Sequence, residues 1–318
     1  MDKRIKISVG GDEYVSGVIR DSLQAIDEFE VLPSPRIAES DIIYWVYGKG
    51  PSMKKNFFFW IKKDPLIINH WIGSDVLAEV ARKKKPGIVR IKYFIEDCIF
   101  RWKLGTGGLL TLAGAPWLVD ELAKTHIQAS YLPITTLDER KLGPVVIQPV
   151  KDIDFISYIP FSRFNFYGGD KIVKLASRWP EFRFLIICAD INEISQEFLQ
   201  KLPANMAITP RVERSQMPEL YNRSKFFIRY TEHDSESLSV FESLYYNLRV
   251  LWTYDFPHTI KIDSEKKLSD SIPSLVKNWE PNYQGHEYVV KNFSLEKWKS
   301  DFLTILQSKL PEKFEKNL

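Results

Sequence analysis

Short apolar, strand-like runs alternate with helical patterns along most of this 318-residue chain, and this alternation constrains the fold more than any other feature. In the first half, the strand-like runs cover residues 5–9, 42–46, 66–69 and 109–113, and helical patterns cover 76–82 and 117–124. Continuous apolar strands separated by helices are typical of a parallel sheet covered by helices on both faces. The sequence therefore predicts an α/β fold.

The alternation is interrupted once and then restarts. Prolines at positions 144 and 149 bracket a short extended segment, where we place a domain boundary. Beyond it, strands are expected at 155–159, 182–187, 206–209, 225–230 and 250–252, with helices at 170–179, 194–202, 217–222 and 238–248. We expect domains at 1–150 and 151–290, followed by residues 291–318 with an amphipathic helix at 295–306. Two doubly wound domains in tandem predict a shared ligand crevice at the carboxyl ends of their strands.

Charge and cysteine content exclude several classes of protein. A net charge of +3, from 44 basic and 41 acidic residues, lacks the dense basic field of a nucleic-acid-binding protein. The two cysteines, Cys98 and Cys188, both lie in apolar neighbourhoods, which predicts buried thiols in a reducing compartment rather than disulfides. The first apolar run is much shorter than a secretion signal, and residues 104–119 are too short and too glycine-rich to span a membrane. We expect a cytoplasmic protein.

Two loops of the N-terminal half are candidate ligand sites. Gly10 and Gly11 join a strand to a helix, where the backbone of a glycine loop can approach an anion, but a plain tight turn explains them equally well. His70 and Asp75 follow the strand 66–69, so we expect them at the rim of a cleft. A purely structural role is the competing interpretation for this histidine.

A basic pair follows the first strand of the second domain. Arg163 and Lys171 lie between the strand 155–159 and the next helix, where a guanidinium, an ammonium and a helix N-terminus together suit a diphosphate. Two solvated, unrelated cations are the competing interpretation.

An acidic loop precedes the helix expected at 238–248. Asp234 lies in this loop and Glu242 lies about one turn into the helix, so both carboxylates can face a ligand across the helix start and accept hydrogen bonds from sugar hydroxyls. A structural alternative remains open, because Ser239 and Glu242 also fit the Ser-x-x-Glu capping box.

These features together resemble the GT-B nucleotide-sugar glycosyltransferases, specifically those similar to glycosyltransferase family four, and the likeness spans most of the chain. That family carries two glutamates separated by seven residues, and here the corresponding pair is Asp234 and Glu242, with a shortened first acid. Segments 115–122, 131–133 and 179–187 also resemble the family. The resemblance implies two Rossmann-like domains facing a central cleft, with the final helix packing back on the N-terminal domain.

The resemblance also implies residue roles. Glu242 would bind the nucleotide ribose, and Asp234 the transferred sugar. Backbone N–H groups of Leu238 and Ser239 would join Arg163 and Lys171 on the diphosphate. In the N-terminal domain, His70 would lie near the reacting sugar and the Gly10-Gly11 loop near the donor phosphate.

The implied reaction moves a sugar from a nucleoside diphosphate sugar to a hydroxyl acceptor, with retained anomeric configuration. Arg163, Lys171 and the helix dipole would stabilise the departing diphosphate, so neither a metal nor a cofactor other than the donor substrate is expected. The sequence has no Asp-x-Asp metal motif.

Residues 82–94 mix cations and aromatic side chains, which suits peripheral contact with an anionic inner membrane face and a lipid-linked acceptor. The competing interpretation is a solvated helix end followed by an ordinary strand.

Two alternatives to an active transferase remain. The shortened first acid, and the segment Gly169-Asp170-Lys171 where the family has a Lys-Gly pair, also fit a non-catalytic sugar-nucleotide-binding or scaffolding partner of a glycosylation complex. A two-lobed solute-binding protein would require export, and no signal sequence supports it.

Overall fold

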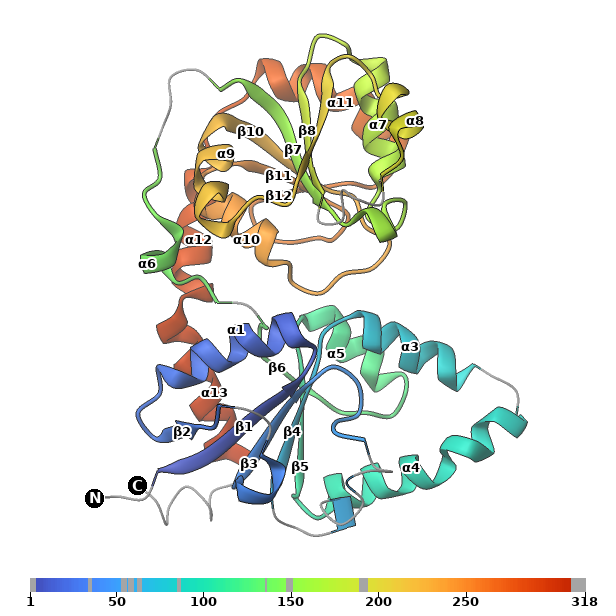
Figure 1. Cartoon of the computed structure of the whole chain (residues 1–318), viewed down its shortest axis with the longest axis vertical. Helices are drawn as coiled ribbons and strands as arrows, with labels where there is room; N and C mark the ends of the chain where they lie inside the picture. Colours follow the sequence, from blue (N-terminus) through green and yellow to red (C-terminus); the bar gives the residue numbers. More distant parts are fainter. Residues whose placement is uncertain are drawn as a thin grey trace. The chain divides into compact units, whose positions relative to one another are not determined.

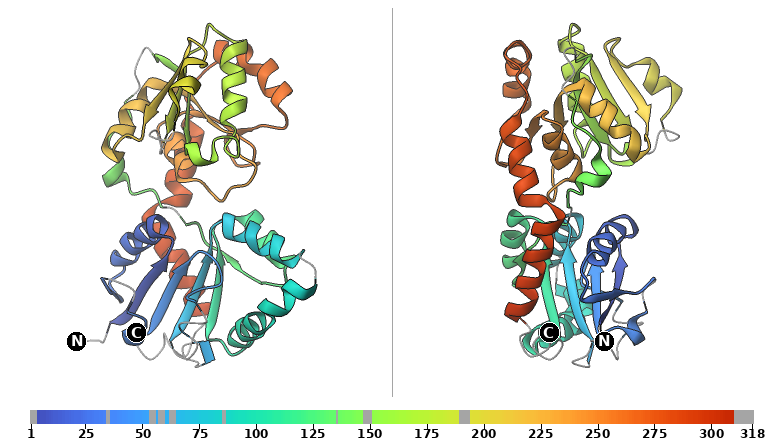
Figure 2. Two further views of the ribbon diagram at one scale, coloured as in Figure 1. Left: turned by 45° about the vertical axis from the view of Figure 1, so that its right-hand side comes forward. Right: turned by 90° about the vertical axis from the view of Figure 1, so that its left-hand side faces the viewer.

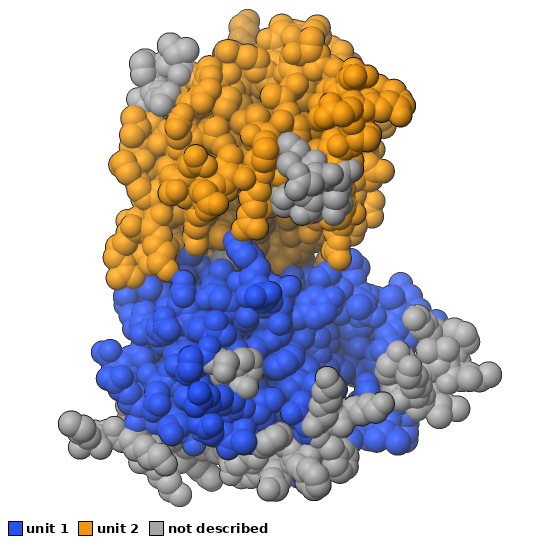
Figure 3. All heavy atoms as spheres, viewed as in Figure 1, with its two compact units in different colours: residues 1–136, 295–318 blue, residues 137–294 orange. Residues whose placement is uncertain are grey.

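The computed structural model describes residues 4–33, 36–52, 56, 60–61, 65–84, 87–134, 136–146, 151–188 and 194–309, without the side chains of 87–93 and 309. The chain divides into two compact units, coloured separately in Figure 3. Unit 1 comprises residues 1–136 and 295–318, and unit 2 comprises residues 137–294. Each unit is built on its own six-stranded sheet (Figure 1).

The sheet of unit 1 is parallel throughout and has the strand order β2-β1-β3-β4-β5-β6. Its strands are β1 (Ile5–Gly11), β2 (Phe29–Val31), β3 (Ile42–Val46), β4 (Leu66–Trp71), β5 (Leu109–Ala113) and β6 (Ser130–Tyr131). Its helices are α1 (Glu13–Gln24), the short η1 (Ile37–Glu39), α3 (Ser74–Lys83), α4 (Gly87–Gly105), α5 (Pro116–Ala123) and α13 (Leu295–Lys309).

Helices cover both faces of this sheet, as apolar strands require. α1 and α13 share one core with β1, β3 and β4, and α13 contributes Trp298, Phe302 and Leu306 to it (Figure 2, right). The indole Nε1 of Trp298 also donates a hydrogen bond to the carbonyl of Pro133, at 2.9 Å. The opposite face is covered by α3, α4 and α5, which supply Val76, Phe100, Leu118 and Leu122.

The sheet of unit 2 is also parallel, with the order β12-β11-β10-β7-β8-β9. Its strands are β7 (Ile153–Ile159), β8 (Phe184–Cys188), β9 (Met206–Pro210), β10 (Ser224–Arg229), β11 (Arg249–Trp252) and β12 (Thr259–Lys261). Its helices are α6 (Glu139–Leu142), η2 (Phe161–Arg163), α7 (Gly169–Arg178), α8 (Gln196–Gln200), η4 (Arg214–Gln216), α9 (Met217–Arg223), α10 (Leu238–Tyr245), α11 (Glu265–Lys277) and α12 (Tyr283–Phe293).

The helices of unit 2 also cover both faces of their sheet. α7 and α11 pack on one face, in a core that contains Phe155, Ile172 and Leu268. α10 lies against α12 and the strands β10 and β11, outside that core. The predicted fold class is confirmed: both halves are doubly wound, Rossmann-like α/β units.

Three local expectations were wrong. α4 forms a helix where the competing interpretation of residues 82–94 placed a strand, because packing of its buried face against the sheet outweighs the strand propensity of Ile and Val. Residues 261–318 are polar and lysine-rich, and their pattern predicts a single helix, whereas the structure has α11 and α12 there in addition to α13. Cys98 is exposed on α4, whereas Cys188 is buried as expected. None of the helices in the described ranges is long and apolar enough to cross a membrane.

Candidate functional site

The strand order of unit 2 identifies a switch point between β7 and β10. These strands are neighbours, but the helices that follow them, α7 and α10, pack on different sides of the sheet. Open parallel sheets bind ligands in the crevice outside the carboxyl ends of such strands, because the two following loops diverge there. The loops after β7 and β10 are therefore the candidate site.

A glycine allows the backbones of these two loops to lie in close contact. Gly168, the residue before α7, has φ +71°, and a Cβ added there would lie 2.3 Å from the carbonyl oxygen of Tyr230. Any larger residue would push the loops apart. The backbone N–H of Glu232 also donates to the carbonyl of Phe166, at 3.0 Å. The sequence therefore places the basic loop beside the acidic one by close backbone contact.

The predicted basic pair lies on this edge. Arg163 ends η2 and is exposed, and Lys171 is half-buried in the first turn of α7. The Lys171 ammonium sits 4.3 Å from the centre of the Tyr230 ring, a cation–π contact that holds it against the strand end. Both cations follow β7, at the edge where the acidic loop after β10 begins.

Glu242 is the more buried of the two predicted acids in unit 2, with 7% of its surface exposed. It accepts hydrogen bonds from the Tyr221 hydroxyl, at 3.3 Å, and from the half-exposed Arg214 guanidinium, at 3.4 Å. Burial raises the pKa of Glu242, and the charge of Arg214 and the Tyr221 hydrogen bond oppose that rise. The side chain is thus a costly buried acid with two long hydrogen bonds, which is typical of a binding position.

The start of α10 carries unoccupied donors. Ser237 precedes the helix and makes no side-chain capping bond, and within the described part of the chain the N–H groups of Leu238 and Ser239 meet no acceptor. First-turn N–H groups lack partners inside a helix and attract anions. The capping-box interpretation of Ser239 and Glu242 is wrong, because Glu242 bonds to Arg214 and Tyr221 instead.

Asp234 faces a cation of its own unit. Its two carboxylate oxygens accept from the Arg229 guanidinium at 2.7 and 3.2 Å, and both side chains are about nine-tenths buried. Burial alone would lower the pKa of Arg229, but the carboxylate of Asp234 outweighs burial and raises it. The structure thus brings Asp234 close to α10 but directs its carboxylate to Arg229.

In unit 1, His70 lies inside the sheet with no exposed surface. Its Nε2 lies 2.9 Å from the carbonyl of Leu132, which can only accept, so Nε2 carries the proton. Nδ1 then accepts from the Tyr44 hydroxyl, at 2.7 Å. Burial lowers the pKa of His70 to about 4, against the opposing backbone hydrogen bond to Leu132. The histidine is neutral with both nitrogens occupied, and its role near a reacting sugar stays a prediction.

The other loop candidates of unit 1 also lie at the carboxyl ends of its strands. Gly10 is buried at the end of β1, and Gly11 has φ +112° with its Cβ direction blocked by the carbonyl of Val46. Asp75 is 3% exposed and accepts from the backbone N–H groups of Gly48, Ile72, Gly73 and Val76. Asp75 therefore holds the loops after β3 and β4 together.

The predicted basic and aromatic segment 82–94 falls at the end of α3 and the start of α4. Arg82 and Lys83 form ion pairs with Asp97, at 2.7 and 2.8 Å, and Arg82 also pairs with Glu79. Phe94, at the end of the segment, is 65% exposed. Residues 85–86 and the side chains of 87–93 lie outside the described residues.

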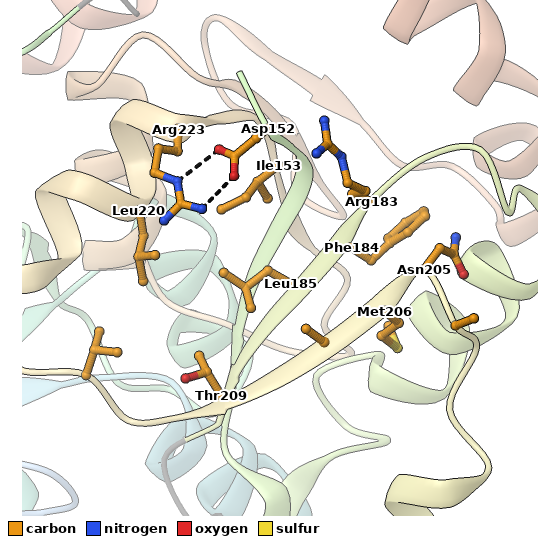
Figure 4. Close-up of a pocket in the computed structure, with 13 residues that line it drawn as sticks. Asp152, Ile153, Arg183, Phe184, Leu185, Asn205, Met206, Thr209, Leu220 and Arg223 are labelled. Atoms are coloured by element: carbon orange, nitrogen blue, oxygen red, sulfur yellow. Dashed lines mark hydrogen bonds and ion pairs between the residues drawn. The ribbon is translucent and has the colours of Figure 1, made fainter. Parts of the chain in front are cut away.

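A separate cavity of about 470 Å³ opens at the opposite edge of the unit 2 sheet (Figure 4). Its floor is apolar, and its rim holds Arg183 and the bidentate ion pair between Arg223 and Asp152. Asp152 and Arg183 lie beside the amino ends of β7 and β8, so this cavity is not the switch-point site.

Sequence reasoning did not select Arg214, Tyr221 and Arg229. Arg229 follows the apolar run 226–228 at the end of its strand, and a cation in that place is a local signal that points to a partner in the following acidic loop. Arg214 and Tyr221 reach Glu242 from the segment after β9. Within the described ranges, no three His, Cys, Asp or Glu side chains gather in a metal-binding arrangement.

The sequence matches no protein-family model and no curated protein. Its structure resembles several solved glycosyltransferase structures. Sucrose-phosphate synthase from Thermosynechococcus elongatus has a TM-score of 0.67 at 12% identity, covering 96% of this chain and 99% of that one. HepE from Anabaena, solved with UDP and glucose, has a TM-score of 0.63 at 10% identity, covering 96% and 100%.

TarM from S. aureus, solved with UDP, a glycerol-linked GlcNAc and fondaparinux, has a TM-score of 0.58 at 12% identity. That match covers 83% of this chain and 55% of TarM, so the chain spans about half the length of TarM. At these identities the likeness establishes the fold alone. The chain has the GT-B fold of these glycosyltransferases, two Rossmann-like units in one polypeptide.

Proposed function

We propose that the protein is a glycosyltransferase that moves a sugar from a nucleoside diphosphate sugar to a hydroxyl acceptor. One observation carries this proposal: at the switch point of unit 2, a buried carboxylate, Glu242, lies one turn into a helix whose first N–H groups have no acceptor among the residues that the structure describes. The carboxylate suits the ribose hydroxyls, and the helix start suits the diphosphate.

The neighbouring cations support the same assignment. Arg163 and Lys171 follow the adjacent strand β7, and the loop between them is joined to the acidic loop by backbone contact. Their charges would stabilise the diphosphate as it departs, together with the α10 dipole. TarM and HepE were solved with UDP, so UDP is the first nucleotide to test and UDP-sugars are the first donors.

Several finer features belong to the same proposal. Two basic side chains and a helix start supply positive charge without a divalent ion, so we propose metal-independent transfer. Retention of configuration and membership of glycosyltransferase family four rest on the resemblance. On the same resemblance, His70 would lie near the reacting sugar and the Gly10-Gly11 loop near the donor phosphate.

Peripheral contact with the inner membrane face and a lipid-linked acceptor are proposed on different grounds. Phe94 and Ile95 of α4 are 65% and 67% exposed, which leaves apolar surface beside the basic segment 82–94. Because Arg82 and Lys83 are already ion-paired, the apolar side chains carry this part of the proposal.

The test is a thermal-shift screen of the whole chain with nucleoside diphosphates and their sugars, followed by calorimetry. We expect one nucleotide to raise the melting temperature and its sugar conjugate to be consumed when acceptors are added. A melting temperature unchanged by every nucleotide at millimolar concentration would refute the proposal.

A non-catalytic sugar-nucleotide-binding partner is the second candidate. One observation favours it, since the shortened acid Asp234 is paired with Arg229 rather than open to a sugar. Measurable donor hydrolysis or transfer by the purified chain decides against it, whereas nucleotide binding with neither activity decides for it.

A further inference from the structure

Arg229 contacts several parts of the switch point. It ends β10, and its guanidinium makes two bonds to Asp234 and lies 4.4 Å from the centre of the Tyr167 ring, in the loop after β7. Its Nη1 reaches the carbonyl of Tyr158 in β7, at 3.4 Å. One buried cation therefore joins two neighbouring strands, the basic loop and the acidic loop.

Asp234 is held from its other side as well. Its backbone N–H donates to the hydroxyl of Tyr254, at 3.1 Å, and its carboxylate accepts from the N–H of Ser235, at 3.1 Å. Both oxygens already serve Arg229 in a bidentate arrangement, the strongest and most directional pairing these groups make. With the Ser235 N–H, these bonds fill three of the roughly four acceptor positions of the carboxylate, which leaves little capacity for a sugar hydroxyl.

We infer that Asp234 is a positioning residue, whose ion pair with Arg229 sets the acidic loop and thereby the start of α10, rather than the residue that holds the transferred sugar. This inference rests on the proposed function, because the groups being positioned are the N–H donors of Leu238 and Ser239. Only three residues separate Asp234 from Leu238, so a fixed Asp234 restricts where the helix can begin.

The shortened acid follows from this role. Arg229 and Asp234 are five residues apart in one connection between strand and loop, and they already meet at 2.7 Å. A glutamate would bring an additional methylene into a site where both side chains are about nine-tenths buried. An aspartate has the right length for the pair.

The chain offers a matched control. Arg223 and Asp152 form a second bidentate pair in the same unit, at 2.5 and 2.9 Å, but at the amino end of β7. Breaking this pair removes the same chemistry at the edge away from the switch point. Because the control pair is 35% and 41% exposed, against 10% and 11% for Arg229 and Asp234, it contributes less to stability, so the melting temperature of every variant is measured beside its binding.

The experiment compares Asp234→Asn, Arg229→Gln and their double variant with Asp152→Asn. Binding of UDP and of UDP-glucose is measured by calorimetry for each. We expect both site variants to weaken the two ligands by the same factor, about tenfold. We expect the double variant to be no worse than either single variant, because one interaction is being removed, and Asp152→Asn to bind normally.

The opposite result is equally clear. If Asp234→Asn binds UDP normally and weakens only the binding of UDP-glucose, Asp234 holds the sugar and the inference is wrong. If Arg229→Gln binds both ligands normally, the ion pair does not position α10 and the inference is also wrong. Asp234→Asn removes the negative charge that neutralises the buried Arg229, which keeps its contacts with Tyr158 and Tyr167, so this variant is prone to misfolding. The double variant, which buries no unpaired charge, then decides between the two roles.

Hydrogen exchange on the free protein separates this inference from the proposed function. We expect the amides of residues 235–241 to exchange faster in the site variants and unchanged in Asp152→Asn. If the unaltered chain binds neither ligand, the proposed function fails for uridine nucleotides, and the exchange data still decide whether the pair positions α10. Unchanged exchange in all variants would overturn the inference.

Discussion

Replacing Glu242 by glutamine should separate binding from stability. Glu242 is almost fully buried, and its pKa is raised, chiefly by burial. A carboxyl group with a higher pKa in the folded than in the unfolded state binds protons more tightly when folded, so its contribution to stability falls as pH rises through those two values. Above the pKa of the unfolded state, Glu242 therefore destabilises the fold relative to a neutral side chain. Glu242→Gln should unfold at an equal or higher temperature.

The same substitution should weaken nucleotide binding. A hydrogen bond to a charged group contributes about 1.5–3 kcal/mol, so losing one charge-assisted bond to a ribose hydroxyl should raise the dissociation constant roughly 10- to 150-fold. In the free protein Arg214 competes with the ligand for Glu242, so losing this ion pair offsets part of the loss of affinity. That part is small, because a half-exposed pair at 3.4 Å contributes about 1 kcal/mol or less. Calorimetric titration with UDP measures the loss.

Two further variants make this result specific. Tyr221→Phe removes a donor to Glu242 but leaves its charge, so we expect a smaller loss of affinity. Asp154→Asn removes another buried carboxylate of unit 2, paired with Lys225 at 2.7 Å at the amino end of β7, and should destabilise the fold with binding intact. If Glu242→Gln bound UDP as tightly as the unaltered chain, or if Asp154→Asn bound it equally poorly, the reasoning would be refuted.

Four other outcomes follow from the structure. Burial lowers the pKa of His70 from 6.5 to about 4, so the stability that the neutral histidine contributes is present above pH 6.5, and about 3 kcal/mol of it is lost by pH 4. The free energy of unfolding of His70→Asn, measured in urea, should therefore depend less on pH than that of the unaltered chain. An equal dependence would contradict the burial of His70. Gly11→Ala would place a Cβ 1.6 Å from a carbonyl oxygen and should lower the free energy of unfolding by about 4 kcal/mol in chemical denaturation. Gly107→Ala, at φ +72° but with open space around the Cβ, should lower it by only about 1–2 kcal/mol. Similar losses for the two variants would argue against the clash at Gly11. Sugar transfer should persist after EDTA treatment, and its loss with recovery on adding Mg²⁺ would end the metal-independent proposal. Vesicles containing phosphatidylglycerol should retain the unaltered chain but not the Phe94→Ser, Ile95→Ser variant, and equal sedimentation of the two would remove α4 from the membrane proposal.

The carboxyl-edge loops could be located from sequence because each strand and helix leaves a local pattern. Predicted strands such as 42–46 and 109–113 coincide with β3 and β5, and the predicted cations and acids fall in the loops after β7 and β10. The sequence patterns did not predict helices in one stretch of polar composition. The lysine-rich stretch that contains α11 and α12 looked polar, because each of those helices buries only one narrow face.

The alternating pattern by itself determined that this chain builds two parallel sheets with helices between the strands, because side-chain periodicity is a local property. It did not determine which charged groups meet. That depended on the order of strands, which puts β10 next to β7 and β9 farther along the sheet. Only the tertiary structure decided that Tyr221 reaches Glu242 and that His70 is enclosed, since contacts between distant segments follow from packing.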